Sequence, residues 1–250
     1  MKPPNNTYTI HQEKLKDGVS FNMVFVEGDR FIMGDDEVEG YLLKPKPAHE
    51  VELRSYYIGQ FPVTQALWEA VMRKRPSEFI GPDRPVEMVS WKNCQEFLSR
   101  INQQLGLTGI RAYRLPTESE WEFAARGGIY RSEHIFAGSS RLEKAGWFRE
   151  NSHSETQPGG LLAPNELGLY DMSGNVLEWC EDWFDENYYR ECYQTGVVSN
   201  PKCTKKGDFR VLRGGSWYHV ESYCRIANRF RNFSYRPMGI IGFRLSRTAL

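Results

Sequence analysis

The sequence predicts an α+β domain built from a small mixed sheet, two main helices and many irregular loops. Three observations lead to this fold class. Helical periodicity is confined to a few short segments, strand-like alternation occurs in short scattered runs, and the stretches between them are rich in turn signals and follow neither period. Few helices, short strands and many turns are typical of an α+β domain rich in irregular structure.

The N-terminal part supplies the first strands. Residues 1–18 are polar and rich in proline and asparagine, so a flexible arm is expected there. Residues 21–33 read as two short strands joined by a hairpin turn at Gly28, and alternation predicts another strand over residues 49–58. We find no internal repeat and no second domain boundary, and one core suffices at this length, so residues 19–250 are expected to form a single domain.

Two amphipathic segments predict the main helices. Thr64 is placed to cap a helix over residues 65–73, and Ser90 is placed to cap a helix that runs to about residue 105. A shorter helix is expected after Thr117, because Glu120 stands three residues further on, as in a capping box. The stretches 129–165 and 183–208 have little periodicity and are expected to be long loops.

The charge balance excludes some classes of partner. The chain has 32 basic and 32 acidic residues, which argues against a nucleic acid or an anionic membrane held by bulk electrostatics. The sequence contains no run of 18 apolar residues, so no membrane span is predicted. The first residues also lack the apolar core of a signal peptide. Membrane contact is therefore expected only through a removed or lipidated N-terminal segment.

The cysteines leave the redox state open. Five are present, and their spacings match no zinc pattern. Cys192 and Cys203 are candidates for a disulfide in an oxidising compartment, whereas the odd total leaves at least one thiol free.

The C-terminal segment 210–244 is the most informative stretch. Gly214 and Gly215 near its start, and Gly242 near its end, suit a backbone that turns tightly or approaches another segment closely. Between them, many aromatic and apolar residues follow no period for long. Such residues form either an irregular core or a recognition surface.

Four motifs stand in the order and spacing of a known family. They are RLPTESEWEFAARGG (114–128), GLYDMSGNVLEWCEDW (168–183), RVLRGGSW (210–217) and GFR (242–244). Over roughly residues 20–247 the chain resembles the formylglycine-generating-enzyme, or sulfatase-modifying-factor, domain. This resemblance implies an elaborated C-type-lectin-like fold, with a buried ion-pair network at four motif residues: Arg114, Glu120, Glu122 and Arg126.

The chain departs from the enzymes of this family at their metal site. Those enzymes oxidise a sulfatase cysteine with two cysteines, five positions apart, that hold copper(I). The second position falls on Cys224, but the first is His219, so we expect no enzyme and a packed Cys224. The five histidines also lack the spacing of the iron-binding branch. A formylglycine-generating-type oxidoreductase that lacks the two-thiol site is the alternative, and a non-catalytic regulatory copy is a weaker one.

The variable proteins of diversity-generating retroelements are the branch that the chain resembles most. Their frame, RGGSW…CR.ANR…GFR, encloses positions that are mutated at adenines, and the same frame occurs here in a cassette over residues 210–244. The function implied is macromolecular recognition by the enclosed side chains. These candidate ligand-binding residues are Tyr218, His219, Val220, Tyr223, Phe230, Arg231, Phe233, Tyr235, Met238 and Ile240.

The resemblance also suggests partners and a compartment. The expected ligand is a protein or other macromolecule on another cell or phage, bound by a monomer at the cell surface or outside the cell, with the cytoplasm as the alternative. No cofactor is required. A structural calcium is the one ion implied, with Asp171, Gly174, Val176 and Glu178 at the ligand positions, and a hydrogen-bonded turn without an ion is the alternative.

Overall fold

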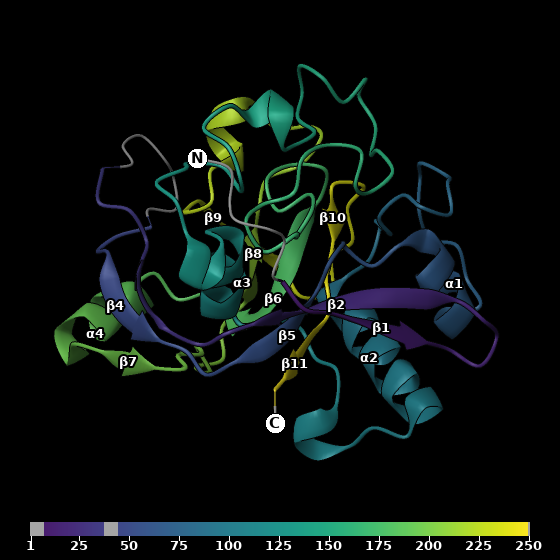
Figure 1. Cartoon of the computed structure of the whole chain (residues 1–250), viewed down its shortest axis with the longest axis horizontal. Coiled ribbons are helices and arrows are strands. Elements are labelled where there is room, and N and C mark those ends of the chain that lie inside the picture. The colour runs from purple at the N-terminus through teal and green to yellow at the C-terminus, as the bar shows by residue number, and fades with distance from the viewer. Residues whose placement is uncertain (1–7, 38–44, 250) are drawn as a thin grey trace.

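Three small sheets and four α-helices form the framework of the computed structural model, which describes residues 8–37 and 45–249 (Figure 1). The first sheet has the order β1-β2-β5-β11, with strands Ile10–Lys14, Ser20–Val26, Tyr56–Gly59 and Ser246–Thr248. The second has the order β10-β6-β8-β9, with Ile241–Gly242, Leu177–Trp183, Phe209–Arg213 and Arg229–Phe233. The third has the order β3-β4-β7, with Arg30–Met33, His49–Glu52 and Val198–Ser199. The α+β class is confirmed, but several sheets replace the single sheet that we predicted.

The first sheet joins the two ends of the described chain. β1 pairs antiparallel with β2, from Ile10 with Val24 to Lys14 with Ser20, and β11 pairs antiparallel with β5. The predicted flexible arm over residues 1–18 is therefore wrong for residues 10–14, because β2 offers them a free strand edge. Residues 1–7 of that arm lie outside the described residues.

The predicted hairpin at Gly28 is wrong, because β2 and β3 belong to different sheets. Gly28 instead lets two segments cross closely: a Cβ there would lie 2.3 Å from the carbonyl oxygen of Leu53. The Gly28 N–H also donates to the Ser55 hydroxyl at 3.1 Å. At this crossing the predicted strand 49–58 divides into β4 and β5. Both crossing segments therefore run between the first and the third sheet at the same place.

The helices begin at the capping residues that we predicted. Thr64 accepts from the Leu67 N–H at the start of α1 (Gln65–Met72), and Ser90 forms a capping box for α2 (Trp91–Leu105). Thr117 and Glu120 form a second capping box at α3 (Glu118–Ala125). The helix α4 (Tyr188–Thr195) lies within residues 183–208, where we predicted only loop.

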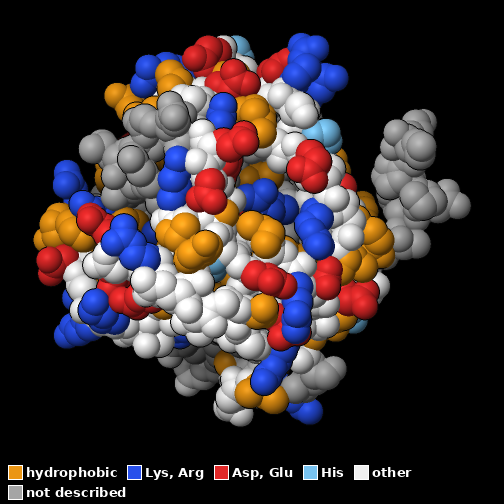
Figure 2. Space-filling view, turned by 90° about the vertical axis from the view of Figure 1, so that its left-hand side faces the viewer, with side chains coloured by type: hydrophobic (Ala, Val, Ile, Leu, Met, Phe, Trp, Pro, Cys, Tyr) orange, Lys and Arg blue, Asp and Glu red, His pale blue; other side chains and the backbone are white. Residues whose placement is uncertain are grey.

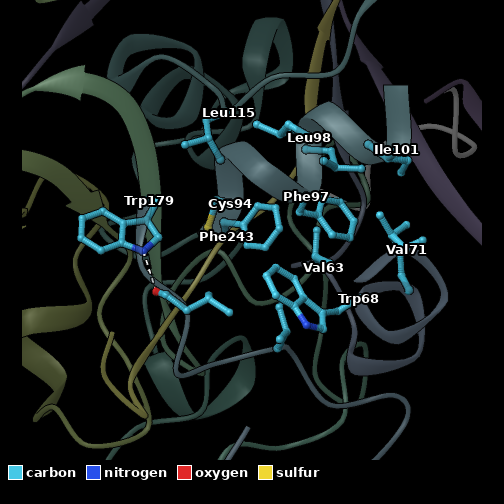
Figure 3. Packing of buried hydrophobic residues seen from close by; sticks show 14 of the residues in the cluster. Val63, Trp68, Val71, Cys94, Phe97, Leu98, Ile101, Leu115, Trp179 and Phe243 are labelled. Atoms are coloured by element: carbon cyan, nitrogen blue, oxygen red, sulfur yellow. Dashed lines mark hydrogen bonds between the residues drawn. The ribbon is translucent and has the colours of Figure 1, made fainter. Parts of the chain in front are cut away.

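The second sheet is buried on both faces. Trp179 and Leu212 belong to a core cluster with α1 and α2, in which the Trp68 and Phe97 rings stack at 5.4 Å (Figure 3). Val211 belongs to a second cluster on the opposite face, under α3. Side chains alternate between the faces of a strand, so β6 and β8 serve both clusters and are fixed from two sides.

The surface composition and the state of the cysteines narrow the possible functions little further. Hydrophobic, acidic and basic side chains are mixed on the face that carries α4, β4 and β7 (Figure 2). All five cysteines are buried and free, so the disulfide between Cys192 and Cys203 is not formed. None of the described helices combines the length and the apolar character needed to cross a membrane.

Candidate ligand-binding surface

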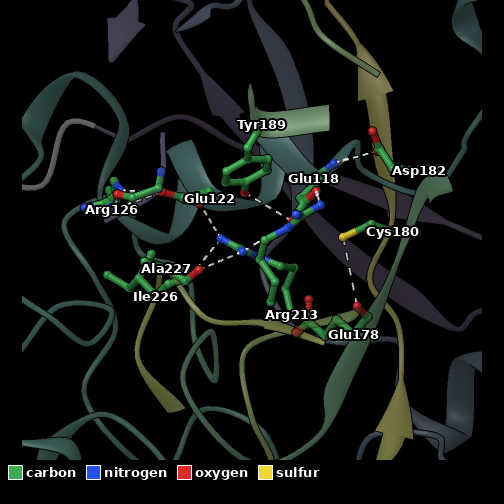
Figure 4. Close-up of polar contacts among 12 residues, drawn as sticks. Glu118, Glu122, Arg126, Glu178, Cys180, Asp182, Tyr189, Arg213, Ile226 and Ala227 are labelled. Atoms are coloured by element: carbon green, nitrogen blue, oxygen red, sulfur yellow. Dashed lines mark hydrogen bonds and ion pairs between the residues drawn. The ribbon is translucent and has the colours of Figure 1, made fainter. Parts of the chain in front are cut away.

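A buried ion-pair network fixes the cassette, residues 210–244, against α3 (Figure 4). The Arg229 guanidinium on β9 makes two bonds to the Glu118 carboxylate, at 2.6 and 2.8 Å. Arg213 on β8 contacts Glu118 at 3.4 Å and pairs with Glu122 as well. Burial raises the pKa of Glu122, but the charges of Arg126 and Arg213 outweigh it and hold that pKa below the ordinary value.

The ion-pair network predicted from the sequence was incomplete. Glu122 pairs with Arg126, and Arg114 makes two bonds of 2.6 Å to Glu120, as expected. Glu118, Arg213 and Arg229 also belong to the network, although they were not predicted. The signal was present, because the RGGSW and ANR motifs each contain a fixed arginine and one more glutamate stands at the start of α3.

The middle of the cassette is fixed through its backbone. Arg213 donates to the carbonyl oxygens of Ala227 at 3.0 Å and Ile226 at 2.9 Å. Gly215 has φ +75°, and a Cβ on it would lie 2.5 Å from the Cys224 sulfur. Only glycine suits this position, because it combines a left-handed backbone with a close contact.

Backbone carbonyls of the candidate residues also accept hydrogen bonds from outside the cassette. Arg149 donates through Nε to the Tyr218 carbonyl at 3.1 Å and through its backbone N–H to the His219 carbonyl at 2.9 Å. The carbonyls of Met238 and Ile240 accept from backbone N–H groups of residues 88 and 177, at 3.1 and 2.8 Å. None of these donors is a candidate side chain. These bonds can therefore hold the loop conformation whichever side chains stand at the candidate positions.

Each candidate side chain reaches solvent, although to different degrees. Tyr218 and Tyr235 are 54% and 62% exposed, and all ten are at least partly exposed. Most of the frame around them is buried, including Arg213, Cys224 and Arg244. Burial thus differs between the enclosing frame and the enclosed candidate positions.

His219 is the centre of one aromatic group on this surface. Its ring stacks on Tyr223 at 5.6 Å and contacts Phe230 at 5.3 Å and Tyr218 at 6.3 Å. Its Nδ1 lies 2.8 Å from the Ser216 hydroxyl. Burial and then the nearby Arg149 charge lower the pKa of His219 to about 4, so the ring is neutral at physiological pH and acts as an aromatic side chain.

The candidate residues lie on two sides of the cassette. Side chains alternate along β9, so Phe230 and Arg231 point to opposite sides of this edge strand. Phe230 joins the His219 group, whereas Arg231 pairs with Glu186 at 2.9 Å. On the Arg231 side, Phe233 packs on Phe209 at 4.5 Å and stacks with Tyr235 at 5.4 Å. The cassette therefore has a His219 face and an Arg231 face.

Three of the candidates also support the core. Phe230, Met238 and Ile240 are partly exposed, but each packs against the cluster that contains Trp68 and Phe97. For these residues the two interpretations of the segment, irregular core and recognition surface, both apply.

The sulfatase-modifying factor enzyme 1-like domain matches residues 11–249. The chain belongs to this family. It is 30% identical to the chaperone protein LppX of Paenibacillus barcinonensis, over 80% of this chain and 79% of the relative. It is also 30% identical to the formylglycine-generating enzyme of Streptomyces coelicolor, over 90% of this chain and 89% of that enzyme. A third relative, the serine/threonine-protein kinase pkn1 of Chlamydia caviae, is 30% identical over 90% of this chain, which spans only 38% of that protein.

Two solved structures show the same architecture. Variable protein 1 of Treponema denticola superposes with a TM-score of 0.85 at 28% identity, covering 96% of this chain and 99% of the other. PvdO of Pseudomonas aeruginosa shares the fold with a TM-score of 0.77 at 24% identity, over 96% and 98% of the two chains. The predicted C-type-lectin-like fold of the sulfatase-modifying-factor type is thereby confirmed.

The copper site of the family's enzymes does not fit this member. Cys224 is fully buried in a small apolar cluster with Phe136, Leu142 and Phe148. Burial raises the pKa of its thiol to about 12, so it is protonated, and the other thiol position holds His219. Within the described ranges no group of three or more His, Cys, Asp and Glu side chains is arranged to hold a metal.

The calcium ligand set implied by the family resemblance also fits poorly. Both Glu178 oxygens accept from Arg244 at 2.7 Å, and one of them also accepts from the Trp121 indole. A cation bound at Glu178 would compete with that guanidinium. Asp171 uses one oxygen to accept from the Gly160 N–H at 3.1 Å, in the hydrogen-bonded turn that was the alternative. Gly174 and Val176 offer only backbone carbonyls.

Proposed function

We propose that the chain is a ligand-binding protein that displays the cassette side chains for macromolecular recognition, in the manner of the variable proteins of diversity-generating retroelements. One observation carries the proposal. The candidate side chains reach solvent, while cassette carbonyls such as those of Tyr218 and Met238 are held by donors outside the cassette. The similarity to variable protein 1 of Treponema denticola supports the same scaffold role.

This arrangement suits a surface whose residues change. Replacing Tyr218 or Tyr235 removes an exposed ring and leaves the frame bonds from Arg213 and Arg149 in place. A loop that is already ordered loses less conformational entropy on binding, which raises affinity. Tyrosine and histidine rings add contact area at a small entropic cost, as in antibody paratopes.

The proposed ligand is a protein or other macromolecule on another cell or phage. Both cassette faces are rich in rings, and Arg231 and Arg236 add donors on exposed positions. A monomer acting at the cell surface or outside the cell suits such a ligand, and neither a nucleic acid nor a required cofactor is part of the proposal.

Two displayed libraries test the proposal. The first randomises six outward positions: Tyr218, His219, Tyr223, Arg231, Phe233 and Tyr235. The matched control randomises six frame positions: Arg213, Ser216, Ala227, Asn228, Arg229 and Arg244. We expect most first-library members to resist protease and to yield binders to unrelated protein targets, and most control members to be cleaved. Equal protease sensitivity in the two libraries would contradict a display function.

An oxidoreductase of the formylglycine-generating type is the second candidate. The observation in its favour is Cys224, which occupies one of the two thiol positions of the family's enzymes. Its burial and its protonated thiol favour a packing role instead. Mass spectrometry of a cysteine-containing sulfatase peptide after incubation with the protein separates the two, because an aldehyde product would refute the binding proposal. A non-catalytic regulatory role predicts neither an aldehyde nor binders from the library.

A further inference from the structure

Two carboxylates that have no basic partner among residues 8–37 and 45–249 meet at the edge of the His219 face. Glu87 is fully buried, and its Oε2 has no hydrogen-bond partner. Glu78 is exposed, and its Oε2 lies 2.4 Å from the point where a Cβ on Gly239 would stand. The Glu87 Oε2 lies 3.6 Å from the same point. The missing side chain of Gly239 therefore lets two carboxylate oxygens converge beside the cassette.

The Glu87 carboxylate is held in this position. Its other oxygen accepts from the Phe79 N–H at 3.0 Å, and its backbone N–H donates to the Ser77 hydroxyl at 3.2 Å. Burial raises the pKa of Glu87 to about 7, opposed by backbone hydrogen bonds from Phe79 and Glu78, and the Glu78 charge raises it further. A rigid carboxylate that is buried beside another acid, without a cation, is costly for the fold to maintain.

Two aromatic rings, Trp217 of the cassette and Phe79 outside it, lie beside the two acids. The Trp217 indole donates to the Gly239 carbonyl at 2.9 Å, and the Phe79 ring meets Trp217 edge-on at 5.2 Å. Trp217 in turn contacts Tyr218 of the His219 face at 5.7 Å. Carboxylates together with the faces of aromatic rings are common surroundings of a bound ammonium.

We propose that Glu78, Glu87 and Gly239 form a subsite for a lysine-type ammonium of the ligand, at the edge of the His219 face. The subsite rests on the proposed function, because it would contact the same ligand as the cassette. An ammonium fits better than a guanidinium, since the two oxygens belong to separate carboxylates, 2.4 and 3.6 Å from the Cβ position of Gly239. The three rotating donors of an ammonium can reach both oxygens, whereas a guanidinium prefers one carboxylate in a planar fork. The exposed Glu78 has no ion pair within the described ranges and can move aside to admit the group.

The experiment uses a small probe in place of the unidentified ligand. Nα-acetyl-lysine N-methylamide is titrated into the full chain at pH 8, with Nα-acetyl-norleucine N-methylamide as the uncharged probe of similar shape. The side-chain carboxyl carbons of Glu78 and Glu87 are followed by NMR. We expect the lysine probe to bind, the norleucine probe not to bind, and the Glu87 pKa to fall when the lysine probe saturates.

Variants identify the residues that bind the probe. Glu78→Gln and Glu87→Gln should each weaken the lysine probe by at least about tenfold, the size of one lost charge-assisted hydrogen bond. Gly239→Ala should weaken it too, because the added Cβ would lie 2.4 Å from the Glu78 Oε2 and displace that carboxylate. Glu186→Gln, on the Arg231 face, is the matched control and should have no effect. If Glu87→Gln fails to fold, the exposed Glu78→Gln still tests the proposal.

Several outcomes would overturn the subsite. Equal binding of the norleucine probe would make it an apolar contact, and unchanged affinity in the two glutamine variants would place the probe elsewhere. Displacement of the probe by calcium or magnesium, dependent on both acids, would identify a metal site instead. Glu78 and Glu87 lie outside the cassette, so lysine binding can persist when the library test fails. The library can likewise yield binders when the lysine probe does not bind.

Discussion

Glu118 on α3 and Arg229 on β9 form a two-bond ion pair, although 111 residues separate them in the sequence. Both side chains are only 2% exposed, and Arg229 also lies over the Tyr189 ring at 4.0 Å. The pair fixes the edge strand of the second sheet directly before Phe230 and Arg231, the residues at which the cassette divides into two faces. The position of both faces therefore depends on one buried carboxylate.

Glu118→Ala should destabilise the protein strongly. The change leaves the Arg229 and Arg213 guanidinium groups buried without one of their partners, which typically costs about 3–5 kcal/mol. The free energy of unfolding in urea at pH 7 measures it. Glu186→Ala is the matched control. It removes the exposed partner of Arg231, which lies on the same strand as Arg229, and should cost no more than about 1 kcal/mol. Similar losses in both variants would show that α3 does not fix the cassette.

Glu87 should make stability fall as the pH rises. Its pKa is about 7 in the folded protein against an ordinary value of 4.5, so its contribution is fully present below pH 4.5 and is lost as the pH rises through 7. Glu87→Gln removes this loss. Relative to wild type, the variant should gain up to about 3 kcal/mol between pH 4.5 and pH 8.

Unfolding in urea across this pH range measures the difference between the two proteins. Burial raises the pKa values of Asp171 and Asp182 to about 6 and 7 as well, but these groups are common to both proteins and cancel. A difference that does not change with pH would rule out Glu87 as the titrating group.

Much of the fold was predictable from local signals. The caps at Thr64, Ser90 and Thr117 locate three helices, because a capping side chain acts within one turn of its helix. The helix α4 was not predicted, because it buries only Tyr189 and Cys192 and has no side-chain cap. Propensity and period are weak when so little of a helix is buried.

The parts of the fold and of the site that could not be predicted depend on contacts between distant segments. The false hairpin at Gly28 has a local turn signal, but the Leu53 backbone that crosses it is 25 residues away and decides the outcome. The frame and the enclosed positions of the cassette could be separated by sequence, whereas their division into two faces required the strand β9. Glu78 and Glu87 were not singled out, because only the fold brings Gly239 beside them.

Removal of calcium should leave the protein unchanged. Arg244 already neutralises Glu178, so we expect EDTA and added calcium to shift the thermal midpoint by less than about 1 °C at pH 7.5. Differential scanning fluorimetry measures the shift, and magnesium serves as the control ion. A saturable rise of several degrees with calcium alone would instead support the calcium site at Asp171 and Glu178 that the family resemblance implies.

Gly215→Ala should disrupt the cassette through its backbone. The residue has φ +75°, and the new Cβ would lie 2.5 Å from the Cys224 sulfur and 2.8 Å from the Cys224 Cα. Backbone strain of about 1 kcal/mol and a clash inside a packed region should together cost about 3 kcal/mol or more. Gly18→Ala is the matched control, because Gly18 has φ +93° with nothing within 4 Å, so this variant should show only the loss due to backbone strain.

Cys224→Ala should rescue Gly215→Ala only in part, since the Cα and Cβ of residue 224 remain in contact. Full rescue in a urea double-mutant cycle would show that the sulfur alone makes glycine necessary, and a loss no larger than that of Gly18→Ala would show that the loop can move away from Cys224.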